Sequence, residues 1–187
     1  RRLLVKHYGD LQKILKPVNT SLARNIVTRN IQFSRRSIDV AFICSNMNRT
    51  VKNSALAKDI FSKLNSRSKV AVGVGSGMFR GMKNTKYFGL LNNQVIINIL
   101  SNTKLVICTS YYDASPNIIS EALGCGSNIL VSKNCGWSEI YPAKFVCKDI
   151  YDQKEWVRKA QSLTRNNVKF SITQSNMIIA DLMRVLK

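Results

Sequence analysis

The chain has 187 residues, 45% of them hydrophobic, which is enough to build the core of an α/β domain and excludes a disordered tail. No apolar run approaches the length that a membrane-spanning helix needs. The formal net charge of +19 favours an acidic partner, such as nucleic acid, an anionic lipid surface or a phosphorylated small molecule.

The first 37 residues differ from the rest of the chain. They are basic, carry only a weak helical pattern and are interrupted by Pro17. We interpret residues 1–37 as a basic linker or the remnant of a preceding domain. Residues 38–187 are then expected to form one folded domain.

Beyond residue 37, apolar runs alternate with helical patterns. The predicted strands cover 38–45, 69–77, 104–110, 127–133 and 144–149. The first predicted helix begins near residue 52. The other predicted helices cover 94–102, 116–123, 152–165 and 175–186. Such alternation predicts β-α-β units with right-handed crossovers, and therefore a single doubly wound parallel sheet of the α/β class. Ligands of such sheets bind beyond the carboxyl ends of the strands.

The cysteine and histidine content limits the metal and catalytic sites that this chain can form. The five cysteines are Cys44, Cys108, Cys125, Cys135 and Cys147, and no two form a C-x-x-C pair. An odd number in a chain of this size predicts reduced thiols and an intracellular location, in the cytoplasm or at the cytoplasmic face of a membrane. The single histidine, His7, makes a zinc site or a Ser-His-Asp triad within this chain unexpected.

A helix N-terminus follows the third predicted strand. Ser115 is expected to be its N-cap, and Pro116 fits the first helical position. The free N–H groups of Asn117 and Ile118 would then point out of the helix end, where they attract anions.

Two carboxylates lie around this helix start. Glu121 is four residues after Asn117 and shares its face, and Asp113 precedes the helix. A carboxylate cannot bond a phosphate, but it accepts hydrogen bonds from the hydroxyls of a ribose or another sugar. Alternatively, Glu121 pairs with one of the many lysines, and Asp113 caps the helix locally.

The segment resembles the donor site of retaining glycosyltransferases of the GT-B fold. These enzymes carry two acids eight residues apart, then a helix, an apolar strand and a glycine-rich loop ending in glutamate. Asp113 and Glu121 match the acids, "EALGCGSNILVS" matches the helix and strand, and "CGWSE" matches the loop. The resemblance implies that Glu121 holds the donor ribose, that Asp113 contacts the sugar, and that Asn117 and Ile118 bind the diphosphate. Asp113 departs from the family's usual glutamate.

Four further residues complete the candidate site, and the same resemblance implies roles for three of them, Arg49, Lys52 and Tyr87. Arg49 and Lys52, in the loop after the first strand, match a pair that neutralises the donor's pyrophosphate. Gly75 permits a tight turn after the second strand. Tyr87 is assigned to the base pocket, although aromatic residues in such segments are more often part of the core.

The resemblance thus implies the C-terminal, donor-binding half of a hexosyltransferase that retains anomeric configuration and needs neither a metal nor another cofactor. The expected donor is a UDP- or GDP-sugar, and the acceptor is an unidentified glycan, protein or lipid. An N-terminal acceptor domain is expected outside this chain, and an anionic membrane surface is a further possible partner. Two alternatives remain: a basic nucleic-acid-binding module, although no known motif for it is visible, and a non-catalytic α/β interaction domain.

Overall fold

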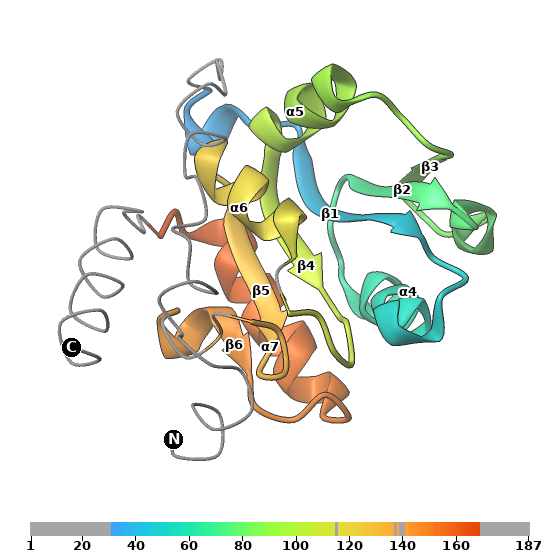
Figure 1. The fold of residues 1–187 in the computed structure, drawn as a ribbon. Helices are drawn as coiled ribbons and strands as arrows, with labels where there is room; N and C mark the ends of the chain where they lie inside the picture. The colour runs from blue at the N-terminus through green and yellow to red at the C-terminus, as the bar shows by residue number, and fades with distance from the viewer. Residues whose placement is uncertain (1–30, 115, 137, 139–140, 169–187) are drawn as a thin grey trace, which may run out of the picture.

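The computed structural model describes residues 31–114, 116–136, 138 and 141–168 (Figure 1). Its centre is a six-stranded sheet in the order β3-β2-β1-β4-β5-β6, with every neighbouring pair parallel. The strands are β1 (Ile38–Asn46), β2 (Lys69–Val74), β3 (Thr85–Phe88), β4 (Thr103–Cys108), β5 (Asn128–Ser132) and β6 (Val146–Cys147). The predicted doubly wound α/β fold is therefore confirmed.

Helices cover both faces of the sheet. The α-helices are α4 (Ser54–Lys63), α5 (Asn93–Ser101), α6 (Asn117–Gly124) and α7 (Gln153–Arg165). Helices α4 and α7 contact each other on one face, and α5 and α6 contact each other on the opposite face (Figure 1). The short 3₁₀ helices are η1 (Phe33–Arg35), η2 (Thr50–Lys52), η3 (Ser76–Phe79) and η5 (Ala143–Phe145). Among the described residues, none of the helices has the length and apolarity to cross a membrane.

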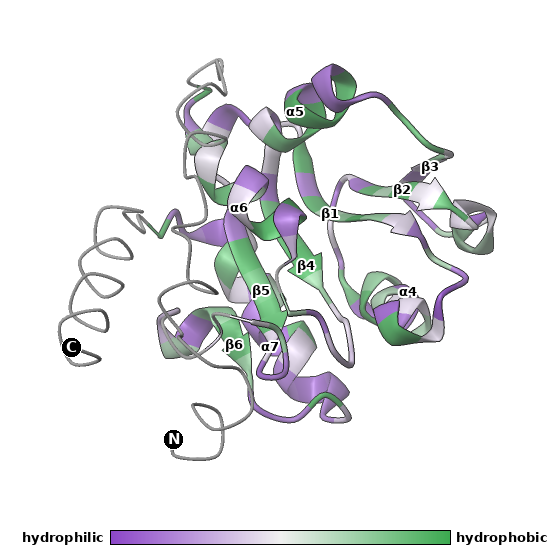
Figure 2. Cartoon of the chain, in the orientation of Figure 1, coloured by the Kyte–Doolittle hydropathy of each residue, from purple (hydrophilic) through white to green (hydrophobic). Residues whose placement is uncertain are grey.

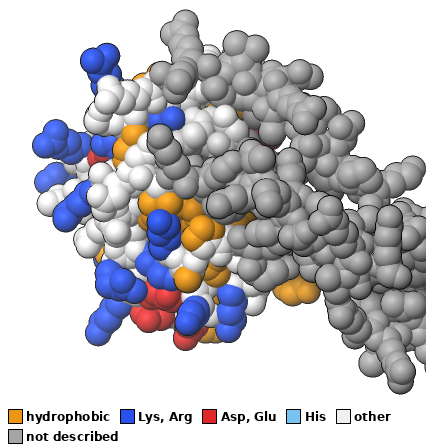
Figure 3. Space-filling model, turned by 90° about the vertical axis from the view of Figure 1, so that its left-hand side faces the viewer, with side chains coloured by type: hydrophobic (Ala, Val, Ile, Leu, Met, Phe, Trp, Pro, Cys, Tyr) orange, Lys and Arg blue, Asp and Glu red, His pale blue; other side chains and the backbone are white. Residues whose placement is uncertain are grey.

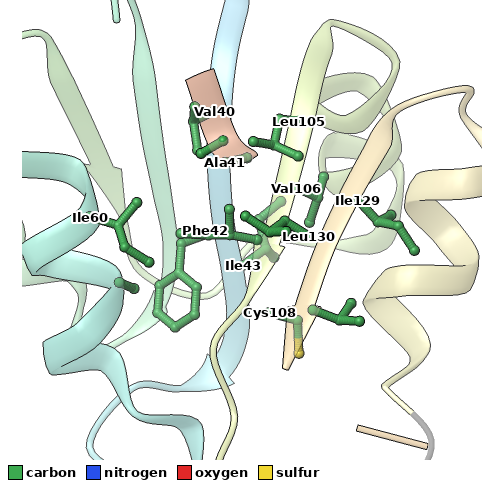
Figure 4. Packing of buried hydrophobic residues seen from close by; sticks show 14 of the residues in the cluster. Val40, Ala41, Phe42, Ile43, Ile60, Leu105, Val106, Cys108, Ile129 and Leu130 are labelled. Atoms are coloured by element: carbon green, nitrogen blue, oxygen red, sulfur yellow. The ribbon is translucent and has the colours of Figure 1, made fainter. Parts of the chain in front are cut away.

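The core lies where β1, β4 and β5 are covered on both sides. Val40, Leu105 and Ile129 are fully buried, and Figure 4 shows them on three neighbouring strands among other buried hydrophobic side chains. Trp156 of α7 is the largest fully buried side chain. Because both sheet faces are covered, these strands are apolar along most of their length, whereas the helices carry polar outer faces (Figure 2).

Two elements differ from the sequence prediction. Strand β3 was not predicted, because its residues "TKYF" lie at the sheet edge, mostly exposed, and lack an apolar pattern. Helix α4 begins at Ser54 rather than near Lys52, because Asn53 adopts a left-handed conformation (φ 48°) that separates it from η2. The helix predicted over 175–186 lies outside the described residues.

The segment just before β1 packs against the domain through Arg36. Its buried guanidinium donates hydrogen bonds to the carbonyls of Thr103 (2.7 Å) and Cys125 (2.8 Å). It thereby joins the start of β4 to the end of α6. The division of the chain at residue 37 stays a prediction, and residues 1–30 lie outside the described part.

Candidate functional site

A cavity of about 420 Å³ opens at the carboxyl edge of the sheet, between the ends of β1 and β4. The strand order reverses between these two strands, which is where doubly wound sheets bind ligands. The volume falls within the roughly 300–1,000 Å³ that is usual for small-molecule pockets. Lining residues come from β1, β2, β4, α5, α6 and the intervening loops.

The loop between β1 and α4 brings Lys52 to the cavity wall. The buried hydroxyl of Thr109 donates to the carbonyls of Lys52 and Asn53, both at 3.0 Å. The backbone N–H of Tyr111 donates to the carbonyl of Val51 at 2.8 Å. These bonds fix the Lys52 loop to the segment that follows β4, so the cation has a defined position.

Lys52 forms an ion pair with Asp113 in the cavity wall. Its Nζ lies 2.6 Å from Asp113 Oδ2, and the two side chains are 19% and 16% exposed. The sequence had assigned these residues to different parts of one ligand. The structure brings them together in the same cavity wall.

The N-terminus of α6 faces the cavity, with Asn117 and Ile118 among the lining residues. The predicted cap was displaced by one position: Pro116 is the N-cap, and α6 begins at Asn117. Pro116 itself has an extended conformation, and the predicted cap, Ser115, lies outside the described residues. The predicted anion-binding groups nevertheless lie at the cavity wall.

Glu121, one turn further along α6, also lines the cavity. It is half-buried, and burial raises the pKa of its carboxyl above the ordinary value. A carboxylate that is partly removed from water gains from hydrogen-bond donors on a ligand. Together with Lys52 and the start of α6, it suits a ligand that carries both anionic groups and hydroxyls.

The loop after β5 supports Asp113 from behind. Asp113 and Cys135 pair as an isolated parallel bridge, and the N–H of Gly136 donates to the carbonyl of Asp113 at 2.7 Å. A Cβ at Gly136 would lie 1.8 Å from the carbonyl oxygen of Ala114. Only glycine permits this approach, so the "CGWSE" loop has a structural reason for its glycine.

Of the predicted site residues that the structure describes, three do not line the cavity. Arg49 is exposed and directly precedes η2. Its positive charge acts to lower the pKa of Cys44, which lines the cavity. Gly75 has a φ of 85° and packs against Asn48, where a Cβ would come within 2.4 Å of Oδ1. Tyr87 lies on the edge strand β3, and its hydroxyl accepts a hydrogen bond from Arg80. Their predicted ligand contacts stay predictions.

Sequence reasoning missed the apolar part of the wall. Leu90, Leu91 and Ile96 line it beside Asn93, from the segment after β3 and from α5. The sequence carries little sign of this apolar wall, because leucine and isoleucine in such a segment also fit an ordinary helix of the core. Gly73 was also missed: in β2 its φ of 144° places it against the Cys44 carbonyl, where a Cβ would lie at 1.9 Å.

Within the described part of the chain, no group of three or more His, Cys, Asp or Glu side chains is arranged to hold a metal ion. Among the residues that line the cavity, Lys52 carries the positive charge.

The fold is that of a doubly wound α/β domain, and the cavity lies at its topological switch point. Residues 80–180, more than half of the chain, match the family model described as glycosyl transferases group 1. The chain therefore belongs to the group 1 glycosyl transferases. A search of curated proteins by sequence found no match.

Solved structures share the fold at low sequence identity. The catalytic domain of cholesterol-alpha-glucosyltransferase from Helicobacter pylori has a TM-score of 0.58 at 11% identity, covering 78% of this chain and 99% of that one. TarM from S. aureus has a TM-score of 0.61 at 18% identity, covering 74% of this chain and 31% of that one. The C-terminal domain of LpcC, a group 1 glycosyl transferase from Francisella tularensis, has a TM-score of 0.56 at 12% identity, covering 77% and 87%.

These neighbours place the fold among GT-B glycosyltransferase domains. The chain spans less than half of the length of several of them, including TarM and the lipopolysaccharide enzyme WaaG, of which it covers 43%.

Proposed function

We propose that this chain is the donor-binding half of a glycosyltransferase and that its cavity holds a nucleotide diphosphate sugar. One observation carries the proposal: a single cavity at the sheet's switch point gathers Lys52, Asp113, Glu121 and the start of α6. A donor of this class has a diphosphate, a ribose and a sugar. Lys52 and the N–H groups at the start of α6 can bind the diphosphate, and the two carboxylates can accept hydrogen bonds from the ribose and the sugar.

In the proposed reaction, the bond between the anomeric carbon and the β-phosphate oxygen breaks. Negative charge grows on the departing diphosphate, and Lys52 with the N–H groups of Asn117 and Ile118 stabilises it. Glu121 accepts hydrogen bonds from the ribose, and Asp113 accepts from the sugar. Because Lys52 supplies the positive charge, we propose that transfer needs no metal. We also propose retention of configuration, as the family resemblance implies.

The named neighbours support a donor of this class and a second domain. One TarM structure contains UDP together with alpha-GlcNAc-glycerol, and TarM is about three times as long as the region it shares with this chain. Similarity to the C-terminal domain of LpcC supports the C-terminal placement. We propose that an N-terminal domain supplies the acceptor site, for a glycan, protein or lipid, and that the enzyme works inside the cell.

The alternative of a nucleic-acid-binding module gains no support from the part of the surface that Figure 3 shows. Figure 3 shows Lys and Arg side chains spaced over the visible face and interrupted by a group of Asp and Glu. A nucleic-acid site gathers its positive charge along one face or groove. We therefore interpret the positive charge on this face as a diffuse field that attracts anionic ligands or an anionic membrane.

A thermal-shift panel tests the proposal. UDP-, GDP- and ADP-sugars, the matching nucleosides and a random-sequence DNA duplex are each added to the chain. A ligand that binds the folded state at 100 times its Kd raises stability by about 2.7 kcal/mol, so a clear shift is expected for one nucleotide-sugar series. The same shift must be lost in Glu121→Ala. The proposed function would be refuted if DNA alone stabilised the chain, or if none of the added ligands did.

A further inference from the structure

Two thiols from different parts of the chain lie in contact at the base of the cavity. Cys108 ends β4, Cys135 lies in the loop after β5, and their Sγ atoms are 3.7 Å apart. They are 6% and 2% exposed, and Cys108 lines the cavity. Cys108 therefore borders the cavity from which a small molecule would approach, and Cys135 is in contact with it.

The surroundings of these thiols differ from those of the other cysteines. The hydrogen bond from Cys135 lowers the pKa of the Cys108 thiol, although burial acts in the opposite direction. The same interaction raises the pKa of Cys135. Burial raises the pKa of Cys44 to about 11 and that of Cys147 to about 12. Since the thiolate is the reactive form, Cys108 is the expected nucleophile among these cysteines.

We propose that Cys108 and Cys135 form an oxidisable pair that closes to a disulfide when the protein meets a hydroperoxide. The Cys108 thiolate attacks the peroxide oxygen, the O–O bond breaks, and a sulfenic acid forms with release of hydroxide. The sulfur of Cys135 then displaces the sulfenic hydroxyl as water. With hydrogen peroxide, two thiols and one peroxide give one disulfide and two waters.

Closure requires only a local movement. The two sulfur atoms must approach from 3.7 Å to the bonded distance of about 2.05 Å. Cys135 lies in a turn rather than in a strand, and Ser132 Oγ, at 3.5 Å from its Sγ, is the neighbouring polar contact. The turn is thus the element that moves toward β4.

This movement would reach the ligand site through Asp113. Cys135 and Asp113 pair as an isolated bridge, and the adjacent Gly136 donates to the Asp113 carbonyl at 2.7 Å. A shift of the turn therefore displaces the carboxylate that pairs with Lys52. This second step rests on the proposed function: we expect oxidation to weaken binding of the nucleotide sugar, and a bound donor to shield Cys108.

The covalent step is tested without any ligand. The chain is treated with graded hydrogen peroxide, alkylated under denaturing conditions, digested and mapped by mass spectrometry. The expected first product is a peptide pair joined by Cys108 and Cys135, reversible by dithiothreitol, while Cys44 stays alkylatable. Cys147→Ser should give the same product. In Cys135→Ser, the sulfenic acid of Cys108 should persist and be trapped by dimedone. Oxidation of Cys44 first, or of Cys108 without a Cys135 link, would overturn the proposal.

The coupling to binding is a separate measurement. The affinity of the reduced and oxidised chain for the nucleotide sugar found in the panel is compared by calorimetry. Oxidation should weaken it by about 5- to 150-fold, the usual range of coupling between sites. Cys135→Ser should lose this peroxide-induced weakening. Equal affinity in both forms would refute the coupling. Failure of the reduced chain to bind any nucleotide would refute the proposed function, and the disulfide would then be decided by the peptide mapping alone.

Discussion

The Lys52–Asp113 ion pair allows a quantitative test in which a matched pair serves as control. The two atoms are 2.6 Å apart, and both side chains are more than four-fifths buried. Exposed ion pairs contribute about 0.2–1 kcal/mol, whereas hydrogen bonds to charged groups in less solvated settings contribute about 1.5–3 kcal/mol. We therefore expect a coupling free energy of about 1–2 kcal/mol from a double-mutant cycle of Lys52→Met and Asp113→Asn.

The control pair is Lys104–Asp39, at 2.8 Å, with side chains 21% and 14% exposed. It joins the starts of β4 and β1, at the sheet edge opposite the cavity. Urea unfolding of each cycle, with and without UDP, gives four coupling energies. Both pairs should couple similarly in the free protein. UDP should reduce only the Lys52–Asp113 coupling, because the diphosphate competes for Lys52. A coupling near zero, or one that UDP leaves unchanged, would refute this account of the site.

Three further predictions follow from single residues. Gly136→Ala should destabilise the chain by about 1–3 kcal/mol because its Cβ meets the Ala114 carbonyl, whereas Gly89→Ala, with no atom within 4 Å, should change stability by less than about 0.5 kcal/mol in urea unfolding. Because burial raises the pKa of Glu121, its ionisation costs stability as pH rises above the ordinary value of 4.5. Glu121→Gln should therefore raise Tm at about pH 7, and the gain should vanish below pH 4.5; a gain that is independent of pH would contradict this. Arg36→Ala should cost about 1.5–3 kcal/mol through its lost bonds to two carbonyls, and an unchanged urea midpoint would show that these bonds are not formed in solution.

The central strands could be predicted because their burial on both faces leaves a continuous apolar run. The runs at Ile38, Lys104 and Ser127 each gave a strand within a few residues of the observed bounds. Strand β3 could not be predicted, since an edge strand with exposed side chains has no such run. The exact start of α6 was displaced by one residue because a proline fits either the N-cap or the first turn.

The site was predictable where a residue type is unusual in its setting. Asp113 and Glu121 are acids in a basic chain, and both line the cavity with Lys52. The cavity's apolar wall and the contact between Cys108 and Cys135 were not predictable, because they depend on how distant segments pack. Burial does not single out this pair either, because four of the five cysteines are buried.

The most direct test of the central claim is a ¹⁵N–¹H correlation spectrum of the chain titrated with UDP and, separately, with uridine. UDP should shift the backbone amides of Asn117 and Ile118 strongly, since we propose that these groups bind the diphosphate. Uridine, which lacks the diphosphate, should leave them nearly unchanged. Shifts confined to other parts of the chain, or equal shifts of these two amides with both ligands, would contradict the claim that this cavity is the donor site.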